Sequence, residues 1–467
     1  MPKKTHLQNL QRIASNYGML LILFLLSVLF SILTISEQYP TGAAAVESVV
    51  KQISRESISG KTFLIMAAEY SEDGEFGSIL SKNIVDSGGK VLQPIFGSPA
   101  EIRAHLEKLM QEGAAPDQLI TTHNLFPTVN LIKSDFENFK QVEVIEPLSY
   151  RWPTFLLTEN IKNVANQITV IAIIAIGMTI VILTAGIDLS VGSLIALSAV
   201  TVAYIVGQTG GIEASTGSLF LAGIGSIILC GAIGAFSGLM VTVFRIPPFI
   251  ATLAMMQVAA GMAYIVSEGK PIYQLPENFI WLGRGVDPLL HIPIAVILML
   301  LLYGLAHFVM TRTIFGRYIY AVGGNIEAAR LAGIRVNLIL LSVYTICGML
   351  AGLGGVVMAS QLKSGAPTYG ATYELYVIAA VVVGGTSLMG GEGRILGTLI
   401  GAFIIAVIQN GMNLVNVESY TQKVVLGLVI LGAVLVDRLK RSGLKKFLPK
   451  KMVEKFTKSS IIKNGSE

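Results

Sequence analysis

The segment that decides the fold is ILTAGIDLSVGSLIALSAV, residues 182–200. It places Asp188 in an apolar region, and no other residue from Val164 to Val206 is charged. A carboxylate at the centre of a bilayer costs roughly 2.5–3.5 kcal/mol. The apolar region has about twice the length that one membrane helix needs. We therefore interpret it as a helical hairpin, with the AGID turn at its cytoplasmic side and Asp188 away from lipid.

The turn carries a group of small and polar residues at Gly186, Asp188, Ser190, Gly192 and Ser193. Glycine at position 186 predicts an unusual backbone dihedral there. Either Asp188 or Ser190 is expected to cap the next helix by accepting hydrogen bonds from its free amides. Two interpretations remain open for this motif. It is a structural cap, or it takes a direct part in coupling or in lining a pathway.

The composition indicates a membrane protein. The chain is 53% hydrophobic and only 13% charged, with a mean hydropathy of +0.67, whereas soluble domains carry about 25% charged residues. The net charge of +5 does not indicate nucleic-acid binding, because Lys and Arg collect at the ends of apolar segments. Cys230 and Cys347 lie in apolar segments without a CxxC partner, which gives no support for a disulfide or a metal site.

The apolar segments predict an α-helical polytopic membrane protein with about ten transmembrane helices. The expected spans are 17–35, 163–185, 189–208, 218–244, 249–267, 291–311, 338–360, 374–388, 394–413 and 422–437. The first of them is long for a signal peptide and lacks a clean cleavage site, so a retained helix is favoured over a signal peptide.

The distribution of basic residues sets the orientation, because cytoplasmic loops are rich in Lys and Arg. Three basic groups fall on one side if the number of spans is even: Lys3, Lys4 and Arg12; Arg312, Arg317, Arg330 and Arg335; and the tail from residue 441 to 467. Both termini are therefore expected in the cytoplasm.

Residues 37–150 have an ordinary soluble composition and should lie outside the membrane, on the extracytoplasmic side. GKTFLIMAAEYSEDG predicts a strand and then a polar loop, EFGSILSKNIVDSGGK a helix, and VLQPIFG a second strand. SPAEIRAHLEKLMQEG has a helix-capping pattern. DQLITTHN and QVEVIEP predict two further strands. The alternation predicts a small parallel α/β domain inserted between the first two membrane helices.

Two further motifs contain short polar breaks. GGNIEAARLAGIRV at 323–336 predicts a short helix in the basic loop 311–337. Two interpretations remain open from the residues alone: it is an ordinary surface helix, or its small residues permit close contact with a partner. VVVGGTSLMGGEGRILGTLIGAF at 381–403 predicts an inner turn at Gly384, Gly385, Gly390 and Gly391. Among the spans no His pair, Ser/His/Asp set or carboxylate dyad occurs, which argues against an enzyme and against ion-coupled transport.

Three segments resemble the membrane permease subunits of bacterial ABC importers of the ribose, galactose and xylose class. They are PTFLLTENIKNVANQITVIAIIAIGMTIVILTAGIDLSVGSLIALSAV, GRYIYAVGGNIEAARLAGIRV and YELYVIAAVVVGGTSLMGGEGRILGTLIGAFIIAVIQNGMNL. The resemblance covers residues 1–36 loosely and about 150–440 well. It divides the chain into an N-terminal tail and helix (1–36), the insert (37–150), a permease core (151–440) and a basic tail (441–467).

The resemblance implies a homodimer in the bacterial inner (plasma) membrane that moves a monosaccharide along its interface. An ABC ATPase subunit would hold the ATP and Mg, so this chain itself would bind no cofactor. The family's EAA-x-x-x-G pattern matches Glu327, Ala328, Ala329 and Gly333, which implies that the loop 311–337 docks on the ATPase. A sugar-binding protein would deliver the substrate from outside.

The insert departs from the family, whose members join these helices by a short loop. It resembles one lobe of a sugar-binding protein, and two roles remain open: a docking or structural module, or a sugar-contacting lobe. Alternatives for the whole chain also remain. It could be a stand-alone facilitator or channel with an external ligand-sensing domain, or an ABC permease for an autoinducer furanone or a nucleoside.

Overall fold

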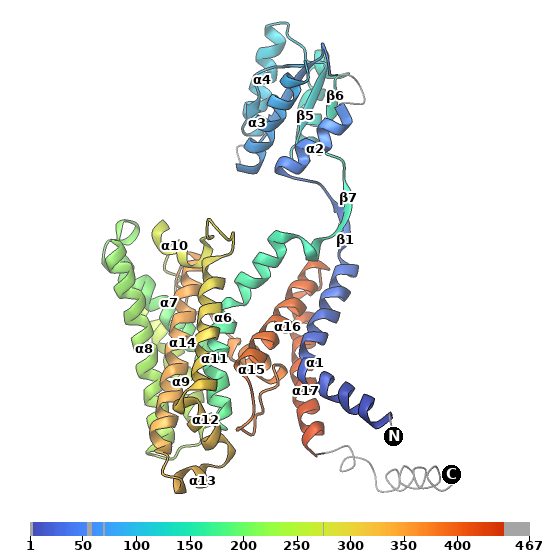
Figure 1. Cartoon of the computed structure of the whole chain (residues 1–467). Helices are drawn as coiled ribbons and strands as arrows, with labels where there is room; N and C mark the ends of the chain where they lie inside the picture. Colours follow the sequence, from blue (N-terminus) through green and yellow to red (C-terminus); the bar gives the residue numbers. More distant parts are fainter. Residues whose placement is uncertain (1–2, 54–57, 69–70, 274, 443–467) are drawn as a thin grey trace. The chain divides into compact units, whose positions relative to one another are not determined.

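The computed structural model describes residues 3–53, 58–68, 71–273 and 275–442. The chain divides into two compact units. Ile35–Thr154 forms the smaller unit, termed the insert unit here, and the chain before and after it forms the helical unit (Figure 1). The basic tail beyond residue 442 lies outside the described residues. Each unit has its own hydrophobic core.

The helical unit contains a helix at each of the ten predicted spans. These are α1 (Lys3–Leu33), α6 (Thr158–Leu183), α7 (Val191–Gln208), α8 (Thr216–Thr242), α9 (Pro248–Val266), α11 (Ile294–Arg312), α14 (Val336–Leu362), α15 (Tyr373–Val383), α16 (Ile395–Leu414) and α17 (Ser419–Ser442). Among the described residues, seven helices are long and apolar enough to cross a membrane: α6, α7, α8, α9, α11, α14 and α16. The fold is that of a polytopic membrane protein.

The connections of the helical unit also contain short helices. They are η2 (Thr154–Leu156), η3 (Gly211–Glu213), α10 (Glu277–Arg284), α12 (Ile314–Gly324) and α13 (Ile326–Leu331). The prediction of one full span at 374–388 is wrong, because α15 has only 11 residues. Such a helix rises about 16 Å, half the thickness of a bilayer core.

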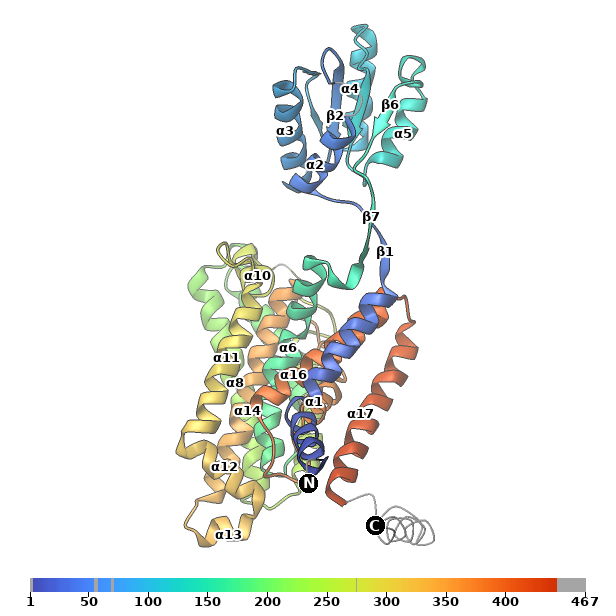
Figure 2. The same ribbon diagram turned by 45° about the vertical axis from the view of Figure 1, so that its right-hand side comes forward.

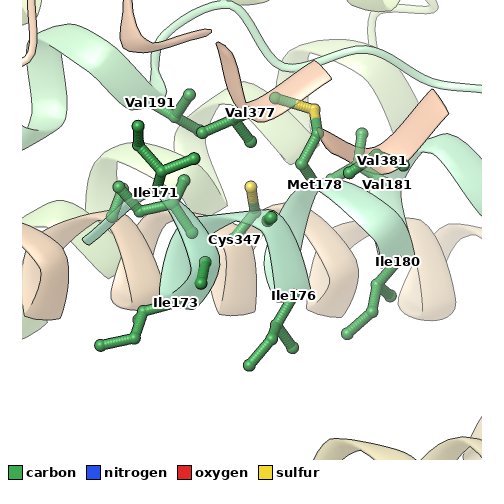
Figure 3. Packing of buried hydrophobic residues seen from close by; sticks show 14 of the residues in the cluster. Ile171, Ile173, Ile176, Met178, Ile180, Val181, Val191, Cys347, Val377 and Val381 are labelled. Carbon is green, nitrogen blue, oxygen red and sulfur yellow. The ribbon is translucent and has the colours of Figure 1, made fainter. Parts of the chain in front are cut away.

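Helix α14 occupies the centre of the helical unit and packs against α6, α7 and α8. Small residues permit these contacts, as in other membrane bundles. A Cβ at Gly177 of α6 would lie 2.8 Å from the Cα of Cys347 in α14, so only glycine fits there. Figure 3 shows Cys347 surrounded by apolar side chains, among them Ile173, Ile176 and Met178 of α6. Cys230 and Cys347 are free thiols buried in this core.

The insert unit is an α/β fold with two sheets (Figure 2). An antiparallel ribbon pairs β1 (Ile35–Gln38) with β7 (Tyr150–Pro153). The main sheet is parallel, with β3 (Lys90–Val91) and β4 (Ile95–Phe96) on one side of β2 (Thr62–Ala67), and β5 (Gln118–Thr121) and β6 (Glu143–Ile145) on the other. The helices are α2 (Gly42–Ile53), α3 (Ser71–Asp86), α4 (Pro99–Gln111), α5 (Phe126–Ser134) and η1 (Glu137–Phe139).

Helices cover both faces of the main sheet. Side chains from α2 and α3 form one core against it, and side chains from α4 and α5 form the other. Helix α3 begins at Ser71, so the predicted polar loop is helical from that residue onward. The segment VLQPIFG forms two short strands instead of one, because both β3 and β4 pair with β2.

The capping pattern before α4 has the expected geometry. The backbone amide of Ser98 donates to Glu101 Oε2 at 2.6 Å, and its hydroxyl donates to the same oxygen at 2.8 Å. These bonds, the backbone one first, lower the pKa of the Glu101 carboxyl below its usual value.

The separate cores predict that the insert unit can lose stability on its own. Leu64 is fully buried beneath α4 and α5, so Leu64→Ala should destabilise the insert unit by about 2–5 kcal/mol. Hydrogen exchange of the full chain in nanodiscs should speed up in β2 and β5 and stay unchanged in α6 and α14. Leu131→Ala, at a side chain that is 71% exposed, is the control and should change neither. Faster exchange in both units would contradict independent cores.

Candidate functional site

A cavity of about 260 Å³ opens within the helical unit, among α6, α14, α15 and α16. Its lining residues are Val164, Gln167, Ile168, Ile171, Met358, Gln361, Leu362, Tyr373, Tyr376, Ala406 and Gln409. They come from the first half of α6, the start of α15 and the last parts of α14 and α16. Three consecutive helices and the distant α6 therefore build one cavity with polar groups in an apolar bundle.

Three carboxamides and two phenols supply the polar groups of this cavity. The Nε2 of Gln361 donates to the backbone oxygen of Asn166 at 2.9 Å, which holds that side chain in place. The Gln167 and Gln409 side chains have no hydrogen-bond partner in the part of the chain that the structure describes. The rings of Tyr373 and Tyr376 meet edge to face, with centroids 6.1 Å apart. This lining can accept and donate hydrogen bonds without carrying charge.

Sequence reasoning missed these residues. Gln167 and Gln409 each adjoin an asparagine inside a predicted span, and these polar pairs were the available sign. Which face of a helix lines a cavity depends on the neighbouring helices, and the sequence alone does not give their positions.

The turn after α6 differs from its prediction in one detail. The left-handed residue is Ala185, with φ 61°, and Gly186 has no positive φ. Glycine is needed at 186 for another reason, because a Cβ there would collide with the hydroxyl of Tyr344. The prediction of an unusual dihedral at Gly186 is therefore wrong by one residue, and a close side-chain contact explains the glycine.

Asp188 is fully buried in protein and not in contact with lipid. Its Oδ1 accepts from the amide of Ser190 at 2.9 Å and from the Ser190 hydroxyl at 2.6 Å. These bonds close the turn just before α7 begins at Val191. The other carboxylate oxygen has no hydrogen-bond partner among the described residues. The carboxylate thus orders the loop directly in front of the helix, while the Ser190 side chain makes no cap of its own.

The rest of this motif serves packing around the start of α7. A Cβ at Gly192 would collide with the Glu374 carboxylate and lie 2.6 Å from the Gly370 oxygen. Ser193 is half-buried. None of the five residues predicted in the motif lines the 260 Å³ cavity.

The glycine-rich segment closes against the end of α6. Gly385, Gly390 and Gly391 have φ values of 82°, 81° and 73°, whereas Gly384 is the C-cap of α15 and packs against Gly397. The amide of Gly391 donates to the Leu183 oxygen at 2.9 Å.

The same glycine-rich segment also lies against α12. A Cβ at Gly390 would lie 2.9 Å from both the Ala185 nitrogen and the Gly323 oxygen. The Tyr320 hydroxyl of α12 donates to the Gly393 oxygen at 2.9 Å. The structure therefore brings the turn after α6, the glycine-rich segment and the end of α12 together.

Helix α13 carries the EAA motif at the end of this assembly. Asn325 caps it by accepting from the Ala328 amide at 3.0 Å. Glu327 forms an ion pair with Arg330 at 2.9 Å, and both side chains are exposed. Ala329 is buried, so it packs α13 onto the bundle, whereas Leu331 is 90% exposed. Gly333 has a φ of 81° and ends the helix turn.

The geometry links α13 to the membrane helices through α12 and the glycine-rich segment. The exposed side chain of Leu331 lies on the same short helix as the exposed Glu327–Arg330 ion pair.

Comparison with known proteins shows the family of the chain. Residues 160–434, more than half of the sequence, match the family "Branched-chain amino acid transport system / permease component". The ribose import permease protein RbsC of Escherichia coli strain K12 is 46% identical over 304 residues, which cover 64% of this chain and 91% of that protein. RbsC of Bacillus subtilis is 45% identical, covering 62% of this chain and 87% of its own.

Two sugar permeases are more distant relatives. The D-allose transport system permease protein AlsC of Escherichia coli is 38% identical, over 61% of this chain and 85% of its own. The L-arabinose ABC transporter permease protein AraH of Azospirillum brasilense is 36% identical, over 63% of this chain and 84% of its own. No solved structure matches the chain.

The chain belongs to this family of transport-system permease components. Within the family it is a permease of the ABC sugar-importer type, like its ribose, allose and arabinose relatives.

The hydrogen bonds of Asp188 predict different outcomes for two substitutions. Asp188→Asn keeps an oxygen acceptor for Ser190 and should fold and transport nearly as the native chain does. Asp188→Leu leaves the buried amide and hydroxyl unpaired, which costs about 1–3 kcal/mol for each buried group. Thermal unfolding in detergent and sugar uptake in cells measure the two effects. An Asp188→Asn chain that folds normally but transports no sugar would contradict a purely structural role for this carboxylate.

Proposed function

We propose that the chain is the membrane subunit of an ABC importer that moves a monosaccharide through the cavity among α6, α14, α15 and α16. The observation that carries this proposal is the lining of that cavity. Gln167, Gln361 and Gln409 offer paired donors and acceptors, and Tyr373 and Tyr376 offer aromatic edges and faces. Sugar hydroxyls need hydrogen-bond donors and acceptors such as these carboxamides, and the C–H faces of a sugar ring pack on aromatic rings such as these tyrosines.

The uncharged lining favours a neutral substrate. None of the residues around the cavity is Asp, Glu, Lys or Arg, whereas a zwitterionic amino acid would need partners for both of its charges. The names of the relatives refer to ribose, D-allose and L-arabinose. A pentose or hexose therefore suits both the cavity and the relatives.

The proposed topology has ten membrane helices with both termini in the cytoplasm of an inner-membrane protein. The basic loop containing Arg312, Arg317, Arg330 and Arg335 supports this orientation. The half-length α15 continues a loop whose Ser364 and Ala366 are buried, so loop and helix together make one crossing. The insert unit, which precedes α6, then lies outside the cytoplasm.

The proposed coupling element is α13. A cytoplasmic ATPase subunit would contact the exposed Leu331 together with Glu327 and Ala328, and would itself hold the ATP and Mg. Closure of the ATPase would move α13, and α12 with the glycine-rich segment would pass this motion to the end of α6. A second permease copy and an external sugar-binding protein complete the proposed assembly.

Loss of one carboxamide in the cavity should weaken transport. Gln409→Leu keeps the size of the side chain but removes its hydrogen bonds to the substrate, at about 0.5–1.5 kcal/mol for each bond. We expect the efficiency of uptake of the transported sugar, tested with ribose, D-allose and L-arabinose, to fall about 3- to 10-fold for each hydrogen bond lost. Gln208→Leu, the same change at the exposed end of α7, is the control. Equal uptake by both variants would rule out this cavity as the pathway.

Reversal of charge at α13 should uncouple the ATPase. Glu327→Lys breaks the ion pair with Arg330 and places two cations side by side. We expect ATP-driven uptake and co-purification of the ATPase to be lost while the permease still folds. Combining Glu327→Arg with Arg330→Glu restores the ion pair with reversed polarity, so it separates helix stability from docking. Uptake that persists in Glu327→Lys without any ATPase would instead favour a stand-alone facilitator.

A further inference from the structure

The strand order of the insert unit defines a natural ligand crevice. From β2 the chain passes through α3 to β3 and β4 on one side, and then through α4 to β5 on the other side. The helices after β2 and β4 therefore cover opposite faces of the sheet. In open parallel sheets, ligands bind outside the carboxyl ends of the strands at the point where this direction reverses. Here that point lies between β2 and β5.

A cavity of about 300 Å³ lies at the carboxyl end of β5. Its walls are residues 37–41, from the second half of β1 and the chain just after it, and residues 122–124, which follow β5. All of them belong to the insert unit. The volume falls at the lower end of the range for small-molecule sites.

Hydrogen bonds and ring stacking hold the walls of this cavity in place. The rings of Tyr39 and His123 stack with centroids 3.3 Å apart and planes within 4°. His123 Nδ1 lies 2.7 Å from Glu146 Oε2 at the end of β6. The Nε2 of Gln38 donates to the Ser36 hydroxyl at 2.7 Å and to the Thr154 hydroxyl at 2.9 Å. The chain at the end of β1 and the carboxyl ends of β5 and β6 are thus held against one another.

The chemistry of the lining selects the class of ligand. It combines the carboxylate of Glu37, the carboxamide of Asn124, hydroxyl groups and the Tyr39–His123 aromatic pair. No Lys or Arg is among the lining residues, so a phosphate or carboxylate ligand would lack a counter-charge. The polar walls do not suit a lipid chain. Mixed donors and acceptors beside an aromatic surface suit a neutral polyhydroxylated molecule.

We propose that this cavity of the insert unit is a second monosaccharide site, separate from the cavity in the helical unit. The choice of a monosaccharide among neutral polyols rests on the proposed function. The site itself rests on its place at the carboxyl end of β5 and on the residues that line it. A bound sugar would bridge residues 37–41 to residues 122–124, so it should protect both segments from hydrogen exchange.

The test uses the full chain in lipid nanodiscs with D-ribose, D-allose and L-arabinose as probes. Hydrogen exchange is followed for residues 35–41 and 121–125 as each sugar is titrated. We expect one of the sugars to protect both segments with millimolar or tighter affinity. Tyr39→Ala should raise the sugar concentration needed for half-maximal protection at least tenfold, and Asn124→Leu should raise it as well. Asn83→Leu, at an exposed position of α3, is the matched control and should have no effect.

The outcomes separate this proposal from the transport pathway. Protection that persists in the Gln409→Leu chain and is lost in Tyr39→Ala supports a separate site, whether or not the uptake prediction holds. Absence of protection in the native chain overturns the proposal. Protection that neither Tyr39→Ala nor Asn124→Leu alters overturns it too. If Tyr39→Ala lowers the melting temperature of the insert unit, Asn124→Leu decides, because that side chain is exposed.

Discussion

Backbone amides and carbonyls at membrane depth must find partners within the protein, because the hydrocarbon of a bilayer offers none. Three irregular segments of the helical unit meet this constraint. The Gly391 amide donates to the last carbonyls of α6 at Leu183, and the backbones of Ile272 and Gly365 exchange two hydrogen bonds where the chain leaves α14. Asp188 supplies an acceptor where the backbone in front of α7 has none. Broken helices are stable here because other protein groups replace water.

The same constraint explains why the cavity and the coupling element stand where they do. The half-length α15 brings Tyr373 and Tyr376 into the bundle, where they face the carboxamides of α6, α14 and α16. Its other end runs into the glycine-rich segment, which contacts the end of α6 and Gly323 of α12. One short helix therefore joins the proposed substrate cavity at its start to the proposed ATPase contact beyond its end. In the proposed mechanism, a shift of α13 would reach the cavity wall through α12, the glycine-rich segment and α15.

Much of the helical unit could be predicted from apolar length and the placement of basic residues, because these depend on the bilayer alone. The parts that failed depend on tertiary contacts. The sequence predicted that the backbone conformation requires glycine at 186, but the close contact with the Tyr344 hydroxyl is what requires it. The cavity could not be placed, because the facing of Gln409 depends on three neighbouring helices. In the insert unit, the β1–β7 ribbon escaped prediction because its strands pair across more than a hundred residues, and α2 and α5 lacked clear start signals.

The most direct test of the central claim is thiol labelling at position 409 in proteoliposomes that contain the permease with its ATPase. The native Cys230 and Cys347 are buried, so Gln409→Cys should be the main reactive thiol. The account predicts that a membrane-impermeant reagent labels it from the outer side, that the transported sugar protects it, and that ATP binding removes this access. Labelling that neither sugar nor ATP changes would contradict a substrate pathway through this cavity.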